Sequence, residues 1–139
     1  MKVYGNFING KFVKPYSKKY LNVLNPYTEK VIAKVPDSNK KDVDSAVNSA
    51  RKAFDSGSWG DMTLGERSNI LFKLADLIQK NLLSIAKLES INQGKTIKMA
   101  RDSDIPFAID NLRFFAGAAR AMKDVTPQEY IDYHEKTKH

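Results

Sequence analysis

The clearest pattern in the chain is a helical repeat of apolar residues between positions 63 and 82. Thr63 and Glu66 stand at its start with the spacing of a capping box, in which the hydroxyl and the carboxylate each accept from a free backbone N–H. Apolar residues then recur every three or four positions, at Ile70, Leu71, Leu74, Ile78 and Leu82. This spacing predicts an amphipathic helix with one apolar face.

A second apolar phase follows the first and predicts a second helix. Its members are Ile85, Leu88 and Ile91, and residues 81–84 mark a bend or a second N-cap between the two helices. Gly94 stands where a left-handed C-cap belongs, because glycine takes positive φ without the steric penalty of a Cβ. The two apolar faces need partners, so we expect the flanking segments to pack on this helix pair.

The tripeptide Gly94-Lys95-Thr96 has the ending of a phosphate-binding loop, but the rest of that motif is missing. A phosphate loop needs a second glycine five residues earlier, so that backbone amides can surround the phosphate. That position is Glu89, whose charge repels phosphate. Gly94 also ends a helix, whereas a phosphate loop precedes one. We therefore interpret this tripeptide as a helix cap and not as a nucleotide site.

The first third of the chain has the composition of short β-strands joined by turns. Asn9-Gly10 favours the type I′ turn of a β-hairpin, and the residue before Pro26 avoids the helical region. The predicted elements are a hairpin over residues 7–13, strands over 20–24 and 30–35, and a turn over 25–28. Together they predict a small antiparallel β segment.

Helical spacing returns on both sides of the central pair. Ser38 suits an N-cap, and the apolar stripe behind it is Val43, Ala46, Val47, Ala50 and Phe54. Trp59 follows in a glycine-rich loop, where we expect it to fill a gap between helices and not to stack on a base. After a short helix or turn over residues 96–104, the last helix begins at residue 105. Its apolar positions are Ile109, Leu112, Phe114 or Phe115, and Ala119.

Composition excludes several classes of site. The 139 residues contain no cysteine, which excludes disulfides, thiolate metal sites and a cysteine nucleophile within this chain. No apolar run is long enough for a membrane helix, and no secretory signal is expected at the start. His134 and His139 are five residues apart, whereas a zinc-protease helix needs two histidines four apart, so we interpret them as part of a solvated tail.

The net charge of +7 is concentrated near the N-terminus. Residues 1–41 carry nine lysines against Glu29 and Asp37, while the rest of the chain is balanced. A basic segment can bind nucleic acid, but these lysines are scattered through strand-like sequence. Lysine on an edge strand also deters unwanted strand pairing. We favour this second explanation and expect no nucleic-acid partner.

The same features, in the same order, resemble the N-terminal part of the aldehyde dehydrogenase superfamily. They are residues 7–13, 24–32 and 42–47, then Ala50, Ala53-Phe54, Trp59, Glu66-Arg67, Leu88-Glu89, Gly94-Lys95 and residues 112–117. The resemblance covers nearly the whole chain. It implies an α/β fold: an incomplete Rossmann-like coenzyme-binding domain, of which this chain supplies an antiparallel β hairpin and a layer of helices. It also divides the chain into residues 1–124 of that domain and residues 125–139, the truncated start of an oligomerisation segment.

The resemblance implies an enzyme that oxidises aldehydes to carboxylic acids with NAD or NADP. In that family a cysteine attacks the aldehyde, hydride passes to the nicotinamide, and water hydrolyses the resulting thioester. A thiolate suits this step because it is a strong nucleophile near neutral pH. This chain has no cysteine, so we expect it to be inactive alone, with no catalytic or cofactor-binding residue of its own. The complete enzyme is expected to be a cytoplasmic homo-oligomer that is not bound to a membrane.

The resemblance also assigns two candidate sites. Asn92 and a backbone carbonyl near Val23 match a monovalent cation site, although the family often has aspartate where this chain has Asn92; the alternative is that Asn92 caps a helix end. Asp104 and Phe107 match the aldehyde entrance. Acidic residues there favour cationic substrates in the amino-aldehyde and betaine-aldehyde branch, and an aromatic face attracts ammonium groups. Asp104 is also a candidate N-cap for the helix that begins at residue 105.

Two hypotheses of different kinds therefore remain. In the first, the chain is the N-terminal fragment of an aldehyde dehydrogenase, with ω-amino-aldehydes as the substrate class. In the second, it is a truncated stand-alone interaction or assembly module without catalysis, whose exposed apolar faces bind a partner or a second copy.

Overall fold

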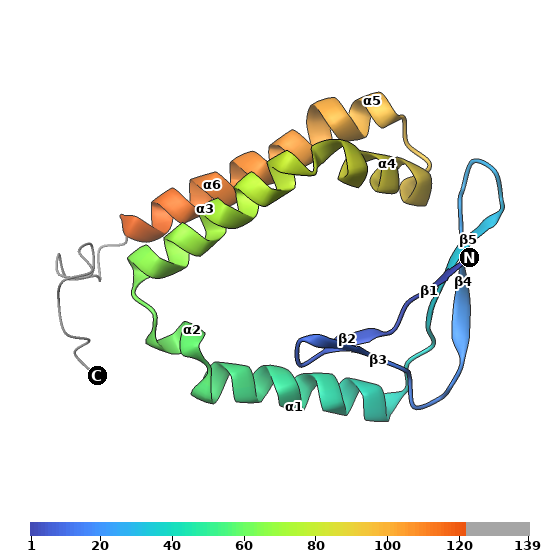
Figure 1. The fold of residues 1–139 in the computed structure, drawn as a ribbon, viewed down its shortest axis with the longest axis horizontal. Helices are drawn as coiled ribbons and strands as arrows, with labels where there is room; N and C mark the ends of the chain where they lie inside the picture. Colours follow the sequence, from blue (N-terminus) through green and yellow to red (C-terminus); the bar gives the residue numbers. More distant parts are fainter. Residues whose placement is uncertain (122–139) are drawn as a thin grey trace. The chain divides into compact units, whose positions relative to one another are not determined.

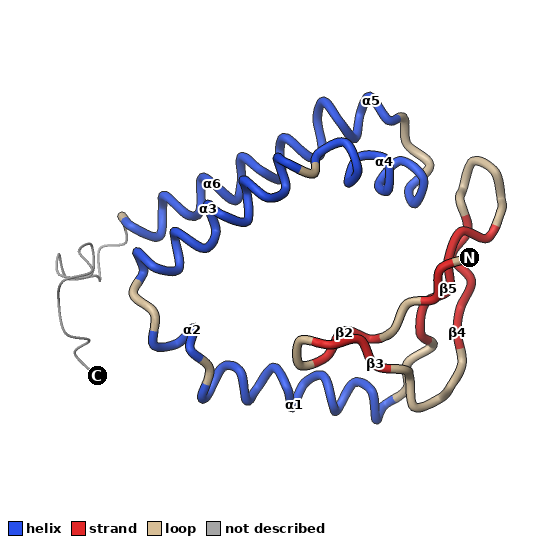
Figure 2. Tube along the Cα trace, viewed as in Figure 1, coloured by secondary structure: helices blue, strands red, loops and turns tan. Residues whose placement is uncertain are grey.

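A computed structural model describes residues 1–121, which form two compact units. The first unit comprises residues 1–57 and 91–94, and the second comprises residues 58–90 together with the chain from Lys95 onward. Within residues 1–121, all strands belong to the first unit and most of the helical residues belong to the second (Figure 2). The predicted oligomerisation segment, residues 125–139, and both histidines lie outside the described residues.

The predicted hairpin is confirmed. Strands β2 (Asn6–Ile8) and β3 (Lys11–Val13) pair antiparallel. Asn9 and Gly10 join them with φ angles of 52° and 74°, the left-handed values that a type I′ turn needs.

The other strands form a separate three-stranded sheet in the order β1-β5-β4. Strand β4 (Tyr20–Leu24) pairs antiparallel with β5 (Val31–Pro36), as the sequence predicted. Strand β1 (Lys2–Val3) pairs parallel with β5, so the expectation of a purely antiparallel segment was wrong. A two-residue strand is too short to show an alternating pattern, and its partner is about thirty residues away in the sequence.

Helix α1 (Lys40–Ser56) begins one residue later than expected. Its N-cap is Asn39, whose side chain accepts from the backbone N–H groups of Lys41 and Asp42, and Ser38 lies before the cap. Asp42 completes the capping box, because its Oδ2 accepts from the Asn39 N–H at 2.9 Å. The apolar side chains of this helix at positions 43, 47 and 54 remain exposed.

A short helical turn, α2 (Ser58–Asp61), lies between α1 and the next long helix. Trp59 belongs to this turn and is 45% exposed, so it does not fill a gap between helices in the described part of the chain. The guanidinium of Arg67 lies over its ring at 5.8 Å. This contact replaces the packing role that the sequence had suggested.

The central helices are α3 (Leu64–Lys80) and α4 (Leu82–Gln93), separated by Asn81 as predicted. The capping box at the start of α3 is confirmed, since Thr63 N donates to Glu66 Oε2 at 2.7 Å and Glu66 N donates to Thr63 Oγ1 at 3.1 Å. Gly94 has a φ of +72°, which confirms the left-handed position after α4.

The last helical segment is continuous through three geometries: α5 (Ile97–Met99), the π-helical turn η1 (Ala100–Asp104) and α6 (Ile105–Arg120). Asp104 itself has helical angles, with φ at −63° and ψ at −50°, and its side chain makes no cap hydrogen bond. The expectation that Asp104 is an N-cap was therefore wrong, because the backbone is already helical before α6 begins. A π-helical turn within a helix often marks a functional position.

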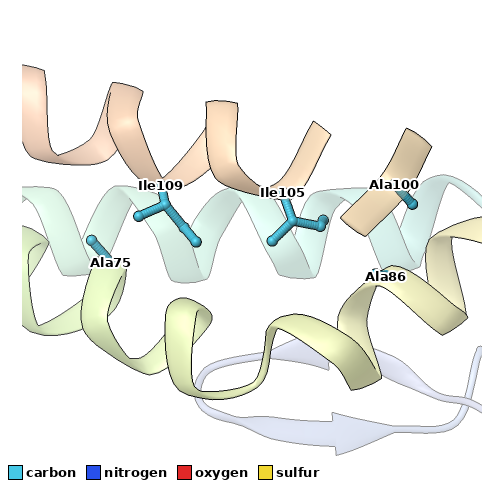
Figure 3. Packing of buried hydrophobic residues seen from close by; sticks show 5 residues of the cluster. All are labelled: Ala75, Ala86, Ala100, Ile105 and Ile109. Carbon is cyan, nitrogen blue, oxygen red and sulfur yellow. The ribbon is translucent and has the colours of Figure 1, made fainter. Parts of the chain in front are cut away.

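Helices α3 and α6 lie side by side along much of their lengths (Figure 1). The core of the second unit lies between α3 and α6 and at the start of α4. Its buried members are Ala75, Ala86, Ala100, Ile105 and Ile109 (Figure 3). Three of these five are alanines, and small side chains allow helices to approach closely. Ser68 is also fully buried, and its hydroxyl donates to the Ala116 carbonyl at 2.6 Å. The closest packing therefore uses small residues that the apolar pattern does not include.

No helix in the described part of the chain is long and apolar enough to cross a membrane.

Candidate functional site

A lysine bound by two carboxylates is the main cluster of charge near the predicted aldehyde entrance. Lys95 Nζ lies 2.7 Å from Asp104 Oδ2 and 2.8 Å from Glu89 Oε1. Each of the three side chains is about one-third exposed or less. We call Glu89, Lys95 and Asp104 the Lys95 triad.

The backbone around Gly94 brings the triad together. Glu89 belongs to the last turns of α4 and Asp104 ends the π-helical turn before α6, so the triad joins the end of one helix to the start of another. Lys95 is fixed between them because its carbonyl accepts from Ser90 Oγ at 2.7 Å. The next residue, Thr96, caps α5 by accepting from the Met99 N–H.

The charges of the triad are only partly compensated. Hydrogen bonds from the ammonium to Asp104 and then to Glu89 raise the pKa of Lys95 above its ordinary value. Two carboxylates against one ammonium leave a formal charge of −1 when all three groups are ionised. Asp104 is thus already bound to a cation within the chain, which the sequence reasoning did not foresee.

Phe107 lies on the same face of the helix as Asp104, because residues three apart are neighbours on a helical surface. Its ring is largely exposed, while Ile105 and Ile109 on the other face are buried. The Phe107 carbonyl accepts from Asn111 Nδ2 at 2.9 Å, one turn further along. The two predicted entrance residues are therefore neighbours at the start of α6, where Phe107 is exposed and Asp104 is about one-third exposed.

The two predicted cation ligands both belong to the first unit. Gly94, two residues after Asn92, approaches Pro26, three residues after Val23, so closely that a Cβ on the glycine would lie 3.0 Å from the proline Cβ. The side chain of Asn92 is exposed. In the described part of the chain, no group of three or more His, Cys, Asp or Glu side chains is arranged to hold a metal ion. A site here would rely on neutral oxygen donors, and it stays a prediction.

The triad was missed at the sequence level for a physical reason. The positions 89, 95 and 104 do not fit the spacing of an ion pair on a single helix, which is three or four residues. The sequence reasoning used Lys95 in the false phosphate loop and in the family resemblance, and in neither case as a partner in an ion pair. The available signal was the combination of a helix-ending glycine with charges on both sides of it.

Replacing Lys95 with methionine should change how stability depends on pH. Because the folded-state pKa of Lys95 is raised, its stabilising contribution is complete below the unfolded value of about 10.4 and is lost as pH rises through the folded pKa. We expect the difference in urea midpoint between wild type and Lys95→Met to be constant from about pH 8 to 9 and to shrink above about pH 10.5.

The control for this measurement is Lys87→Met, which removes an exposed lysine from α4. Lys87→Met should show no such change with pH. Equal pH profiles for the two variants would show that the triad does not contribute to stability.

Comparison with known proteins gives the chain its family. A sequence model of the aldehyde dehydrogenase family matches residues 12–138. Acetaldehyde dehydrogenase of Pseudomonas aeruginosa is 41% identical over 120 residues, which are 86% of this chain and 23% of that protein. The 2-aminomuconic semialdehyde dehydrogenase of Bos taurus is 46% identical over 81% of this chain and 22% of that protein.

Solved structures show the same relationship in three dimensions. The NAD⁺ complex of the Bacillus cereus aldehyde dehydrogenase is 42% identical and matches with a TM-score of 0.78, over 82% of this chain and 23% of that chain. The chain thus spans about a quarter of the length of the relatives it matches. The likeness confirms the expected α/β fold and its place in the N-terminal part of such enzymes. The chain belongs to the aldehyde dehydrogenase family.

Proposed function

We propose that the chain is the N-terminal segment of an NAD- or NADP-dependent aldehyde dehydrogenase and that it serves as scaffold and entrance wall, without catalysis of its own. The observation that carries this proposal is the match of nearly the whole chain to only about a quarter of each relative. A chain without cysteine has no thiolate to attack an aldehyde.

The cofactor belongs to the complete enzyme in this proposal. NAD or NADP would accept the hydride that leaves the substrate. The described residues offer no phosphate loop at the start of a helix, since Gly94 follows the end of α4. We therefore assign no cofactor-binding residue to this chain. A homo-oligomeric state of the complete enzyme is likewise a proposal.

For the substrate class we propose ω-amino-aldehydes, with Asp104 and Phe107 at the entrance. The exposed ring of Phe107 supports this, because an aromatic face attracts ammonium groups. The residual negative charge of the Lys95 triad also favours a cation. Asp104 acts here as part of that triad and not as an isolated carboxylate.

The test is NADH absorbance with aminobutyraldehyde and NAD, using the purified chain alone and then together with a complement. The complement is the Bacillus cereus enzyme without the N-terminal quarter that this chain matches, and we call it the Bacillus complement. We expect no turnover from the chain alone, and turnover that requires both parts when they are combined.

The same assay ranks the substrates. Aminobutyraldehyde should give a higher kcat/KM than butyraldehyde in the combined enzyme, and equal values would contradict the amino-aldehyde proposal. Turnover by the isolated chain, above that of a mock purification, would contradict the fragment proposal.

The second candidate function is a stand-alone interaction module. The exposed apolar side chains of α1 and α6 favour it, since large apolar patches mark interaction surfaces. A stable complex between this chain and an unrelated partner, with no affinity for the Bacillus complement, would support this candidate.

A further inference from the structure

The antiparallel pair of α3 and α6 has one side held by polar contacts. Arg113 Nη2 donates to Asp76 Oδ1 at 2.9 Å, and Arg120 Nη2 donates to Asn69 Oδ1 at 2.8 Å. Both contacts join α6 to α3 through exposed side chains. This side of the helix pair has its own polar contacts, and we call it the polar side.

The opposite side of the same pair is apolar. Leu74 and Phe115 each stand two residues from a member of the Asp76–Arg113 pair, and two residues turn a helix by about 200°. They therefore project away from the polar side. Ile70 and Leu77 extend the surface along α3, because i, i+4 and i+7 share one helical face.

We call Ile70, Leu74, Leu77 and Phe115 the apolar side. All four side chains are exposed, and Leu77 and Phe115 are exposed by more than half. Half-buried Leu71, Ile78 and Leu112 adjoin them toward the helix interface. An exposed and mainly apolar surface of this kind, next to a side that has its own polar contacts, is typical of an interface.

The length of the relatives indicates what covers this surface. The matched segment is 22–23% of the chains compared above, so more than three quarters of each is a fold that this chain does not contain. The segment keeps its fold at 42% identity in the presence of that remainder. A helix pair with one apolar and one polar side fits a position at the edge of a larger fold, where the apolar side is buried and the polar side faces solvent.

We propose that the apolar side of the α3–α6 pair is the surface on which the remaining part of an aldehyde dehydrogenase fold docks. This inference rests on the proposed function and extends it by naming the face. The partner surface is expected to offer aliphatic and aromatic side chains without unpaired charge, because burying a charge against leucine and phenylalanine is unfavourable.

The experiment is co-purification of the tagged 139-residue chain with the Bacillus complement. The wild-type chain is compared with Leu74→Lys on the apolar side and Asp110→Asn on the exposed surface of α6. Both substitutions raise the net charge by one, Leu74→Lys by adding an ammonium and Asp110→Asn by removing a carboxylate. Both sites are solvent-exposed in the chain, so the helices should be retained; circular dichroism checks this. We expect Leu74→Lys to lower capture at least tenfold and Asp110→Asn to leave it unchanged.

Phe115→Lys provides a second test from the other helix and should lower capture to a similar extent. Equal capture by all variants would overturn the proposal. So would no capture by the wild-type chain when the matching N-terminal quarter of the Bacillus enzyme captures the complement under the same conditions.

The alternative occupant, a second copy, is measured by sedimentation. A wild-type dimer that Leu74→Lys converts to monomer, combined with no capture of the complement, would overturn the proposal in favour of self-association. Capture without aldehyde oxidation would leave this inference standing while contradicting the proposed function.

Discussion

Replacing Asp42 with alanine is expected to lower the free energy of unfolding by about 1.5–3 kcal/mol, because the change removes a buried carboxylate that accepts three part-buried hydrogen bonds. Asp42 is only 3% exposed. Its carboxylate accepts from the backbone N–H of Tyr16 at 3.0 Å, from the backbone N–H of Asn39 at 2.9 Å and from Asn6 Nδ2 at 3.2 Å. One side chain thus connects the hairpin and the loop after it to the start of α1.

The size of the effect follows from the number of contacts that the carboxylate makes. Hydrogen bonds to a charged group contribute more than neutral ones, and donors that are only part-buried recover some of the loss by binding water. Asp42→Asn keeps one oxygen in place and should lose less stability than Asp42→Ala. Urea denaturation measures the loss, and hydrogen exchange of the α1 amides locates it.

The control for Asp42 is Asp44→Ala, two residues further along α1. Asp44 is exposed and pairs with Lys40 across one helical turn, a contact that contributes about 0.3–0.5 kcal/mol. A loss from Asp42→Ala no larger than that from Asp44→Ala would show that the buried carboxylate does not hold the first unit together.

Replacing Ile109 with alanine is expected to lower the free energy of unfolding of the second unit by about 2–5 kcal/mol. Ile109 is 2% exposed and belongs to the buried cluster with Ala75 and Ile105. Three of the other four buried members of this cluster are alanines, whose side chains are too short to move into the space that a lost isoleucine leaves. Four larger side chains pack against the cluster, and their relaxation sets where in this range the loss falls; they are Ile78, Leu82, Ile85 and Leu112.

Two further variants serve as comparisons for Ile109→Ala. Ile109→Val removes one methylene and should lose about 0.5–1.5 kcal/mol. Phe114→Ala removes a larger side chain from the exposed surface of α6 and should change stability by less than Ile109→Ala does. A larger loss from Phe114→Ala would mean that the exposed face, and not the α3–α6 interface, stabilises the unit.

The entrance residues show how far sequence reasoning reaches at the candidate site. The family resemblance selected Asp104 and Phe107, and helical spacing alone required them to share a face. The ion pair of Asp104 with Lys95 could not be predicted in this way, because it depends on how α4 and α6 approach each other after Gly94. The role of these residues in substrate entry stays a prediction, as does the cation site at Asn92 and Val23.

The sequence by itself determined the features that depend on a few consecutive residues. The capping box of Thr63 and Glu66, the Asn9-Gly10 turn and the left-handed Gly94 are all present as predicted. Each is fixed by hydrogen bonds or φ angles within about five residues, so the information is local.

Only the tertiary structure decided which side chains are buried and which distant segments pair. Ser68 and Ala75 are buried in the α3–α6 interface, while Leu74 of the predicted stripe stays 43% exposed. The reason is that two helices can approach closely only where their side chains are small, whereas the apolar pattern was read from large side chains. The tertiary structure also placed β1 parallel to β5 and the Asp42 carboxylate beside Tyr16. These contacts join residues 26 or more positions apart, and their geometry is set by packing and not by the spacing of residues along the chain.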